Sequence, residues 1–165
     1  MFTDMLEELR RPKIEPKGWM SDCELILGTT DNLEECIEEC INSDFYGLDV
    51  ETTGLDQRVF DGVTKDKIVG ICLAPSKDKG YYFPLTHSEG ASHNIPWRLM
   101  GDALKRLFDV SVKAQPVLQN AGFDMEFLEF NGYIDGLGAE RWNTPRLWHD
   151  TKILKYLLNP REKGG

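Results

Sequence analysis

The spacing of apolar residues along the chain predicts alternating strands and helices. Short apolar runs bounded by turn-forming residues predict strands at residues 24–27, within 45–55, and at 68–74, 81–85, 116–120 and 146–149. Apolar residues recur at helical spacing after residues 29, 95, 120 and 150. The three strands between residues 45 and 85 follow one another through turn-rich links, which predicts an antiparallel meander. The strand at 116–120 follows a helix and can run parallel to the strand within 45–55, so we expect an α/β fold with a mixed sheet.

Each predicted helix has one apolar face. We expect the helix after residue 29 to be capped by Thr29, Thr30 or Asp31. Its polar face would consist of Glu34, Glu35, Glu38 and Glu39, which we interpret as a contribution to solubility alone. The buried positions are predicted as Leu33, Cys36, Ile37 and Cys40 in this helix, Leu99, Met100, Ala103, Leu104, Leu107 and Phe108 in the next, and Phe123, Phe127, Leu128 and Phe130 in the one after.

The N-terminal residues differ from the rest of the chain. Residues 2–10 could form a short amphipathic helix, which Pro12 and Pro16 would separate from the first strand. We therefore interpret residues 1–20 as an arm or linker and residues 21–165 as one domain, which is long enough to bury a core.

Two carboxylates occur inside the apolar strand within residues 45–55. Residues i and i+2 of a strand share a face, so Asp49 and Glu51 are expected side by side. Two ionised carboxylates that close repel each other, and a buried charge is costly unless it is paired or bound to metal. A divalent cation would resolve this repulsion, whereas on an exposed edge both groups could simply be solvated. Gly54 follows and is free to adopt a positive φ in the turn that ends the strand.

Two more acidic residues lie where a predicted helix begins. Asp124 follows Asn120 by four residues at a strand-to-helix junction, and Asp150 precedes the helix at 151–158. Asp124 could belong to the same site as the first two carboxylates, or it could only complement the helix dipole. We interpret Asp150 as a helix N-cap.

The composition constrains the class of protein. The 165 residues include 19 basic and 28 acidic side chains, and the formal net charge of −9 argues against broad electrostatic attraction to nucleic acid. It does not exclude a phosphate substrate that is bound through metal ions. The cysteines lack zinc-site spacing and are expected to be reduced thiols, and His87 and His93 are expected to be solvated. The N-terminus lacks a secretory pattern and the longest apolar run is too short for a bilayer, which predicts a cytoplasmic protein without a membrane partner.

Three segments resemble the DEDD 3′-5′ exonucleases. Asp49-Val-Glu-Thr-Thr-Gly-Leu55 resembles their first exonuclease motif, and Asn120-Ala-Gly-Phe-Asp124 resembles the second. Residues 149–160 further resemble the segment that follows in the proofreading domain of bacterial and phage family A DNA polymerases. The resemblance covers about residues 24–165. It implies a ribonuclease H-like fold and hydrolysis of the terminal phosphodiester of a DNA strand with two divalent cations, Mg²⁺ or Mn²⁺.

The resemblance also implies a role for each matching residue. Asp49 would bridge both cations, Glu51 would bind the cation that activates water, and Asp124 would bind the other. The implied partner is a single-stranded or frayed DNA 3′ end. The residues that would shape the substrate cleft are Thr52, Leu55, Asn120 and Phe123, with Leu55 against the terminal base.

The third motif of the family, Y-x-x-x-D or H-x-x-x-x-D, does not occur in the sequence. This motif would supply a fourth carboxylate and the side chain that orients the attacking water. We therefore expect the chain to be the N-terminal part of a longer exonuclease or polymerase. By itself it is expected to bind metal weakly and to cleave slowly, because a metal ligand is missing.

Three alternatives remain open. The chain could be an exonuclease that acts on RNA, like ribonuclease D, although residues 52–55 look more like the DNA enzymes. It could be a non-catalytic module that binds DNA or docks on a polymerase. The acids could also be structural, in which case replacing Asp49 would change stability and leave metal binding untouched.

Overall fold

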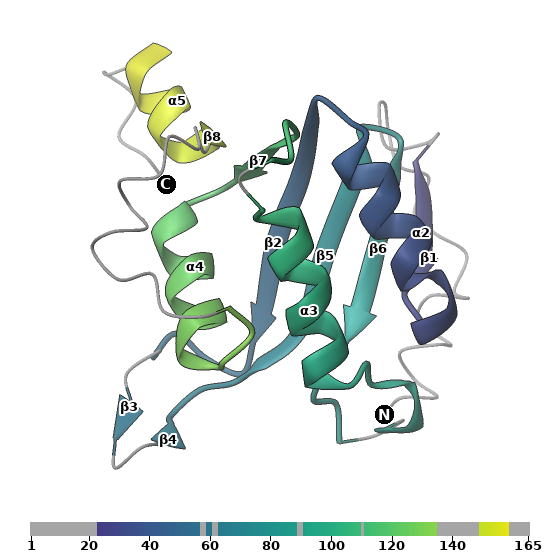
Figure 1. The fold of residues 1–165 in the computed structure, drawn as a ribbon. Helices are drawn as coiled ribbons and strands as arrows, with labels where there is room; N and C mark the ends of the chain where they lie inside the picture. The colour runs from purple at the N-terminus through teal and green to yellow at the C-terminus, as the bar shows by residue number, and fades with distance from the viewer. Residues whose placement is uncertain are drawn as a thin grey trace, which may run out of the picture.

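The computed structural model describes residues 23–56, 59–60, 63–88, 91–109, 111–134 and 149–158. Its strands are β1 (Glu24–Leu27), β2 (Phe45–Thr52), β3 (Val59–Phe60), β4 (Val63–Thr64), β5 (Ile68–Ser76), β6 (Lys79–Pro84), β7 (Gln115–Leu118) and β8 (His149–Asp150). Its helices are α2 (Thr30–Ile41), α3 (Trp97–Leu107), α4 (Ala121–Phe130) and α5 (Thr151–Leu158), with a 3₁₀ turn η2 (Ala91–His93). Figure 1 shows α2, α3 and α4 on one face of a central sheet, with α5 beyond one edge. The predicted α/β alternation is confirmed.

The central sheet is mixed and has six strands in the order β1-β6-β5-β2-β7-β8. β2, β5 and β6 form the predicted antiparallel meander. β7 runs parallel to β2, as predicted, and pairs with residues 45–47 of that strand. β1 and β8 add parallel strands at the two edges. Beyond Gly47, the edge of β2 that faces β7 is therefore open to another partner.

Alternation along β2 separates the core from the exposed carboxylates. Tyr46, Leu48 and Val50 are buried beneath the helices, whereas Asp49 and Glu51 are exposed. Because successive side chains of a strand point to opposite faces, burial of one set places both carboxylates on the other face. The shared face that the sequence predicts for Asp49 and Glu51 is confirmed.

α2 begins with a capping box. The Thr29 hydroxyl accepts from the Asn32 N–H, and the Asn32 side chain accepts from the Thr29 N–H at 2.7 Å. These two bonds satisfy N–H groups that the first helical turn leaves without partners. The buried residues of α2 are the four predicted ones, Leu33, Cys36, Ile37 and Cys40. All four cysteines of the chain are free thiols, as predicted.

The polar face of α2 does more than contribute to solubility, which corrects the interpretation from the sequence. Arg106 of α3 donates to Glu34 at 2.6 and 2.8 Å and also to Glu38. Lys79 of β6 donates to Glu39 at 2.6 Å. These ion pairs fix α2 against α3 and the sheet, although pairs with this much solvent exposure contribute only about 0–1 kcal/mol each.

Two apolar residues depart from the predicted helical faces. Leu99 is 42% exposed and Phe130 is 43% exposed. In α3 the buried face includes Gly101, where a Cβ would lie 3.1 Å from the carbonyl oxygen of Tyr133. The buried face of α3 thus includes a glycine that the sequence pattern did not mark as apolar. In α4 the buried residues include Met125, which was not among the predicted ones.

Other predictions concern links between elements. The link at 56–67, predicted as a loop, contains β3 and β4 as a short antiparallel pair. His87, predicted to be solvated, is half-buried and shares a 2.7 Å hydrogen bond with the Tyr82 hydroxyl. The predicted helix at 2–10 and the part of the last predicted strand before His149 lie outside the described residues. Among the helices that are described, none has the length and apolarity needed to cross a bilayer.

Candidate metal centre

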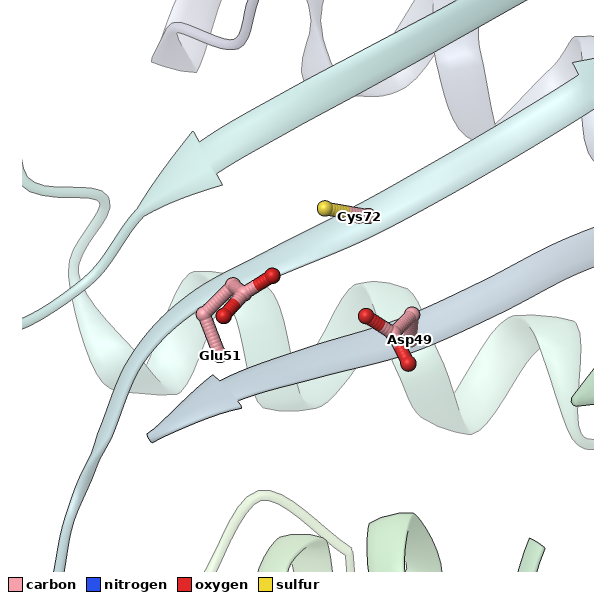
Figure 2. A group of neighbouring side chains, drawn as sticks. All are labelled: Asp49, Glu51 and Cys72. Atoms are coloured by element: carbon pink, nitrogen blue, oxygen red, sulfur yellow. The ribbon is translucent and has the colours of Figure 1, made fainter. Parts of the chain in front are cut away.

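Asp49, Glu51 and Cys72 project into the same space from the neighbouring strands β2 and β5 (Figure 2). One ligand atom of each side chain lies within 4.8 Å of the others. Asp49 is directly opposite Cys72 in the antiparallel pair, so the two side chains share a face of the sheet. That face is opposite the one covered by α2, α3 and α4. Within the described ranges, these three residues form a group that could hold a metal ion.

Asp124 approaches the same part of β2 from the first turn of α4, where it is 1% exposed. Its Oδ1 accepts a hydrogen bond from the backbone N–H of Val50 at 3.1 Å. β7 pairs with β2 no further than Gly47, which leaves this stretch of the strand edge to α4. Val50 stands between Asp49 and Glu51, so Asp124 meets the strand that carries both predicted carboxylates. Among the described residues, however, the group whose ligand atoms lie within 4.8 Å of one another comprises Asp49, Glu51 and Cys72 and does not include Asp124.

The second carboxylate oxygen of Asp124, Oδ2, is buried and has no hydrogen-bond partner in the described part of the chain. Burial raises the pKa of Asp124 to about 6; the Val50 N–H opposes this rise, and the charges of Asp49 and Asp150 add to it. Burial also raises the pKa of Asp49. A cation would provide the missing partner and favour the ionised carboxylates. Carboxylate oxygens are hard donors, so the residues present fit Mg²⁺ or Mn²⁺.

Cys72 is a residue of the site that the sequence did not predict. Burial and the negative charges of Asp49 and Glu51 raise the pKa of its thiol to about 12, so the metal-free thiol is protonated at neutral pH. The predicted meander places Cys72 on the strand next to Asp49, but only the register shows that the two residues are opposite. Because sulfur is a soft ligand, Cys72 would also allow the site to bind thiophilic cations such as Cd²⁺.

A hollow of about 740 Å³ opens on the same face of the sheet, beside Asp49 and Cys72. Its walls are mostly apolar and come from β1, β6, β5, β2 and β7, with Leu25, Leu27, Gly47, Tyr82 and Val117 among the lining residues. Leu25 is 72% exposed. The Asp49 carboxylate therefore lies at the border of a large apolar surface.

The turn that ends β2 is fixed by Asp66. The Asp66 carboxylate accepts from the Asp56 N–H at 2.9 Å, and the Thr52 hydroxyl donates to the Gly54 carbonyl at 2.6 Å. A Cβ on Gly54 would lie 2.4 Å from the Asp66 carboxylate, and Gly54 does not use its freedom to adopt a positive φ. Any larger residue there would force the Asp66 side chain or the turn to move. Leu55, next in the chain, is 82% exposed and available to a ligand.

The two remaining residues of the predicted substrate cleft lie at the start of α4. Phe123 packs against Phe127 with 4.8 Å between ring centroids and is only partly buried. Asn120 is exposed, and its Oδ1 accepts a hydrogen bond from Lys152 Nζ at 3.2 Å. Both residues lie within one turn of Asp124, and their contacts with a substrate stay predictions.

Asp150 caps α5, as predicted. Its Oδ1 accepts from the N–H groups of Lys152 at 2.9 Å and Ile153 at 3.4 Å. The same carboxylate also accepts from the N–H groups of Asn120 and Ala121, at the start of α4. Burial alone would raise the pKa of Asp150, but these four donors outweigh it and hold the pKa below its ordinary value.

Comparison with solved structures finds the same fold in proteins of low sequence identity, with TM-scores of 0.56. The EXO domain of Aedes aegypti Nibbler is 12% identical, and the match covers 87% of this chain and 59% of that domain. S. pombe Pop2p, solved with Mg²⁺ and Mn²⁺ bound, is 14% identical, with 83% of this chain and 76% of Pop2p covered. A chain in the structure of the yeast NOT1 MIF4G domain with CAF1 is also 14% identical, with 89% and 77% covered.

No protein-family model matches the chain, and no curated protein matches it. Identities of 12–14% show a shared fold and no more. The shared fold, found in an EXO domain among other proteins, confirms the ribonuclease H-like fold that the motifs imply. The finer resemblance to polymerase proofreading domains stays a prediction.

Proposed function

We propose that the chain is the metal-binding part of a 3′-5′ exonuclease, which hydrolyses the terminal phosphodiester of a nucleic acid strand, with DNA as the favoured substrate. The observation that carries the proposal is the hydrogen bond between Asp124 and Val50, because it brings a buried carboxylate to the strand that bears Asp49 and Glu51. The fold supports it, since Pop2p shares this fold and binds Mg²⁺ and Mn²⁺ in its solved structure.

Asp49, Glu51 and Asp124 are the residues that would hold two divalent cations. Such cations would stabilise the attacking and leaving oxygens of the hydrolysis and favour ionisation of water. The buried, unpartnered Oδ2 of Asp124 supports this assignment. The chain has a net charge of −9, so its carboxylates must be neutralised before a phosphodiester can approach them.

We propose that the terminal nucleotide contacts Leu55, Thr52, Asn120 and Phe123. Leu55 presents an exposed apolar side chain beyond the end of β2, where a base could stack. Besides its proposed contact with the nucleotide, Thr52 donates its hydroxyl to the Gly54 carbonyl and so holds the turn that carries Leu55. Affinity for the strand would therefore come from apolar contact as well as from the neutralised phosphate.

The chain supplies three of the four carboxylates that characterise the family, and its sequence contains no third motif. We propose that these residues bind Mn²⁺ weakly and cleave slowly by themselves. The setting that the sequence resemblance suggests is a cytoplasmic exonuclease or DNA polymerase.

Titration of the protein with Mn²⁺, followed by paramagnetic broadening of its backbone amide NMR signals, tests the metal site. Broadening should be strongest around Asp49, Glu51 and Asp124, and Asp49→Asn should remove it. Glu35→Gln removes an exposed carboxylate of α2, so this control should behave like the wild type. The proposal fails if Mn²⁺ does not broaden this region or if Asp49→Asn leaves the broadening unchanged.

Digestion of a 5′-labelled DNA oligonucleotide and an RNA of the same sequence tests the substrate. Shortening of the DNA from its 3′ end, dependent on Mn²⁺ and lost in Asp124→Asn, is the expected result. Faster shortening of the RNA would favour the ribonuclease D-like alternative. Mn²⁺ binding without digestion of either strand would favour a non-catalytic module that binds nucleic acid.

A further inference from the structure

The helices α4 and α5 begin at the same carboxylate. β7 and β8 run parallel, with Leu118 paired with Asp150, and a helix follows each strand. Oδ1 of Asp150 accepts from the Asn120 N–H at 3.1 Å, and Oδ2 accepts from the Ala121 N–H at 2.9 Å. Oδ1 also accepts from the Lys152 N–H at the start of α5. One side chain therefore holds the N-termini of both helices.

α4 has no capping side chain of its own. Asn120 occupies the N-cap position with a left-handed φ of 64° and makes no side-chain capping bond. The first N–H groups of a helix need acceptors, and a non-glycine residue persists in the left-handed region only where its surroundings hold it. Asp150 supplies the acceptors, and Lys152 Nζ donates to the Asn120 side chain at 3.2 Å. The start of α4 is held from outside, by the segment that begins α5.

Asp124 lies in the first turn of α4, next to this anchor. Its Oδ1 is bound to the Val50 N–H, and its Oδ2 is buried without a partner among the residues that the structure describes. A helical turn is stiff, so a shift of the α4 N-terminus would move the Asp124 carboxylate relative to β2. We propose that Asp150 is a positioning residue, which holds the Asp124 carboxylate against Val50 and close to Asp49.

This role is more than the capping of α5. Two of the four donors to Asp150 belong to the start of α4. Every residue of α5 is exposed, so α5 itself adds little packing that a cap would protect. If Asp150 served α5 alone, a shorter capping residue could replace it without any effect on Asp124.

The functional consequence rests on the metal site proposed above. Removing a hydrogen-bonding group that orients a metal ligand typically lowers metal affinity by roughly 10- to 100-fold. Asp150 lies outside the proposed ligand set, so its effect on affinity would be exerted through α4. The position of Asp124 can also be followed without metal, because the Val50 N–H reports on its hydrogen bond to Asp124.

The variants Asp150→Ser and Asp150→Asn separate the two roles of this carboxylate. Serine is a good N-cap for α5 but is too short to reach Asn120 and Ala121. Asparagine keeps one side-chain oxygen as an acceptor and replaces the other with an NH₂ group, which cannot accept from the Ala121 N–H. It is therefore the milder change. Thr29→Ala removes the N-cap of α2 and is the matched control for loss of a helix cap elsewhere.

The readouts are the NMR signal and hydrogen exchange of the Val50 amide without metal, and the Mn²⁺ Kd measured by calorimetry. Asp150→Ser should shift the Val50 signal, speed its exchange and weaken Mn²⁺ binding by roughly 10-fold or more, with Asp150→Asn intermediate. Thr29→Ala should lower the Tm and leave both readouts unchanged.

An unchanged Val50 amide in both Asp150 variants would overturn the inference, whatever their melting temperatures. If the wild-type protein does not bind Mn²⁺, the proposed function fails instead. The Val50 amide would then still decide whether Asp150 positions Asp124.

Discussion

Val50 donates its backbone N–H to the side chain of Asp124, which follows 74 positions later in the chain, at 3.1 Å. The bond joins the middle of β2 to the first turn of α4. Val50 lies between Asp49 and Glu51, so this hydrogen bond brings the Asp124 carboxylate close to other acidic side chains. Asp124 and Asp49 repel each other when no cation is bound. This repulsion has measurable consequences.

The contribution of Asp124 to the free energy of unfolding of the metal-free protein should fall as the pH rises. The pKa of Asp124 is raised from 3.8 to about 6, so between these values the folded state keeps a proton that the unfolded state has lost. The stabilisation that comes from protonated Asp124 is fully present below pH 3.8. About 3 kcal/mol of stability is lost as the pH rises from 3.8 through 6. Asp124→Asn keeps an oxygen for the Val50 N–H and should lose this pH dependence.

Denaturant unfolding in EDTA, at about pH 4 and about pH 7.5, measures that contribution as the difference between wild type and Asp124→Asn. The variant should be the more stable protein at the higher pH. Curves with the same pH dependence in both proteins would show that Asp124 does not retain its proton.

Asp49→Asn should weaken Mn²⁺ binding by roughly 10-fold or more, because it removes a charged ligand from the site. The metal-free variant should be at least as stable as the wild type, since repulsion with Asp124 is relieved. Calorimetric titration and thermal unfolding in EDTA measure the two effects, with Glu35→Gln as the control. A loss of stability with unchanged Mn²⁺ affinity would mean that the carboxylates are structural.

Cys72→Ser should weaken Cd²⁺ binding by roughly 10-fold or more and change Mg²⁺ binding little, because sulfur prefers soft cations and a hydroxyl does not. Cys72 lies within 4.8 Å of the ligand atoms of Asp49 and Glu51, close enough to complete a mixed donor set. Competition titrations give both affinities, and thiolate-to-cadmium absorbance reports the sulfur directly. Equal Cd²⁺ affinities in the two proteins would exclude Cys72 from the site.

Gly54→Ala should destabilise the protein by about 1–3 kcal/mol, because its Cβ would lie 2.4 Å from the Asp66 carboxylate. The turn that carries Leu55 would then have to move. Gly122→Ala is the matched control, since no atom lies within 4 Å of its Cβ and alanine favours the helix by about 0.5–1 kcal/mol. Denaturant unfolding of both variants should show opposite signs.

Local patterns predicted the elements because each pattern belongs to one contiguous segment. Alternation along β2 placed Asp49 and Glu51 on one face, and helical spacing identified the buried residues of α2. The capping role of Asp150 followed from the same kind of local rule. These features depend on neighbours within a few positions, which the sequence displays directly.

Features that depend on register or on packing between elements were not predicted. Cys72 joins the carboxylates only through the β2–β5 register, and Arg106 meets Glu34 only because α2 and α3 pack together. The sequence suggests that glycine at position 54 serves the turn through its backbone freedom, whereas in the structure the Asp66 carboxylate occupies the place of a Cβ. In each case the partner is distant in the chain, where the spacing of residues carries no information.

The two parts of the candidate centre depend on contacts that form over different sequence ranges. Asp49, Glu51 and Cys72 meet through the antiparallel pair β2–β5, whereas Asp124 arrives only with the crossover that pairs β7 in parallel with β2. Non-local pairing is the slower event in folding. We therefore expect a refolding chain to assemble the cysteine-containing group first and the three-carboxylate centre last, so that the full Mn²⁺ affinity of the native chain would mark only molecules that have completed the crossover.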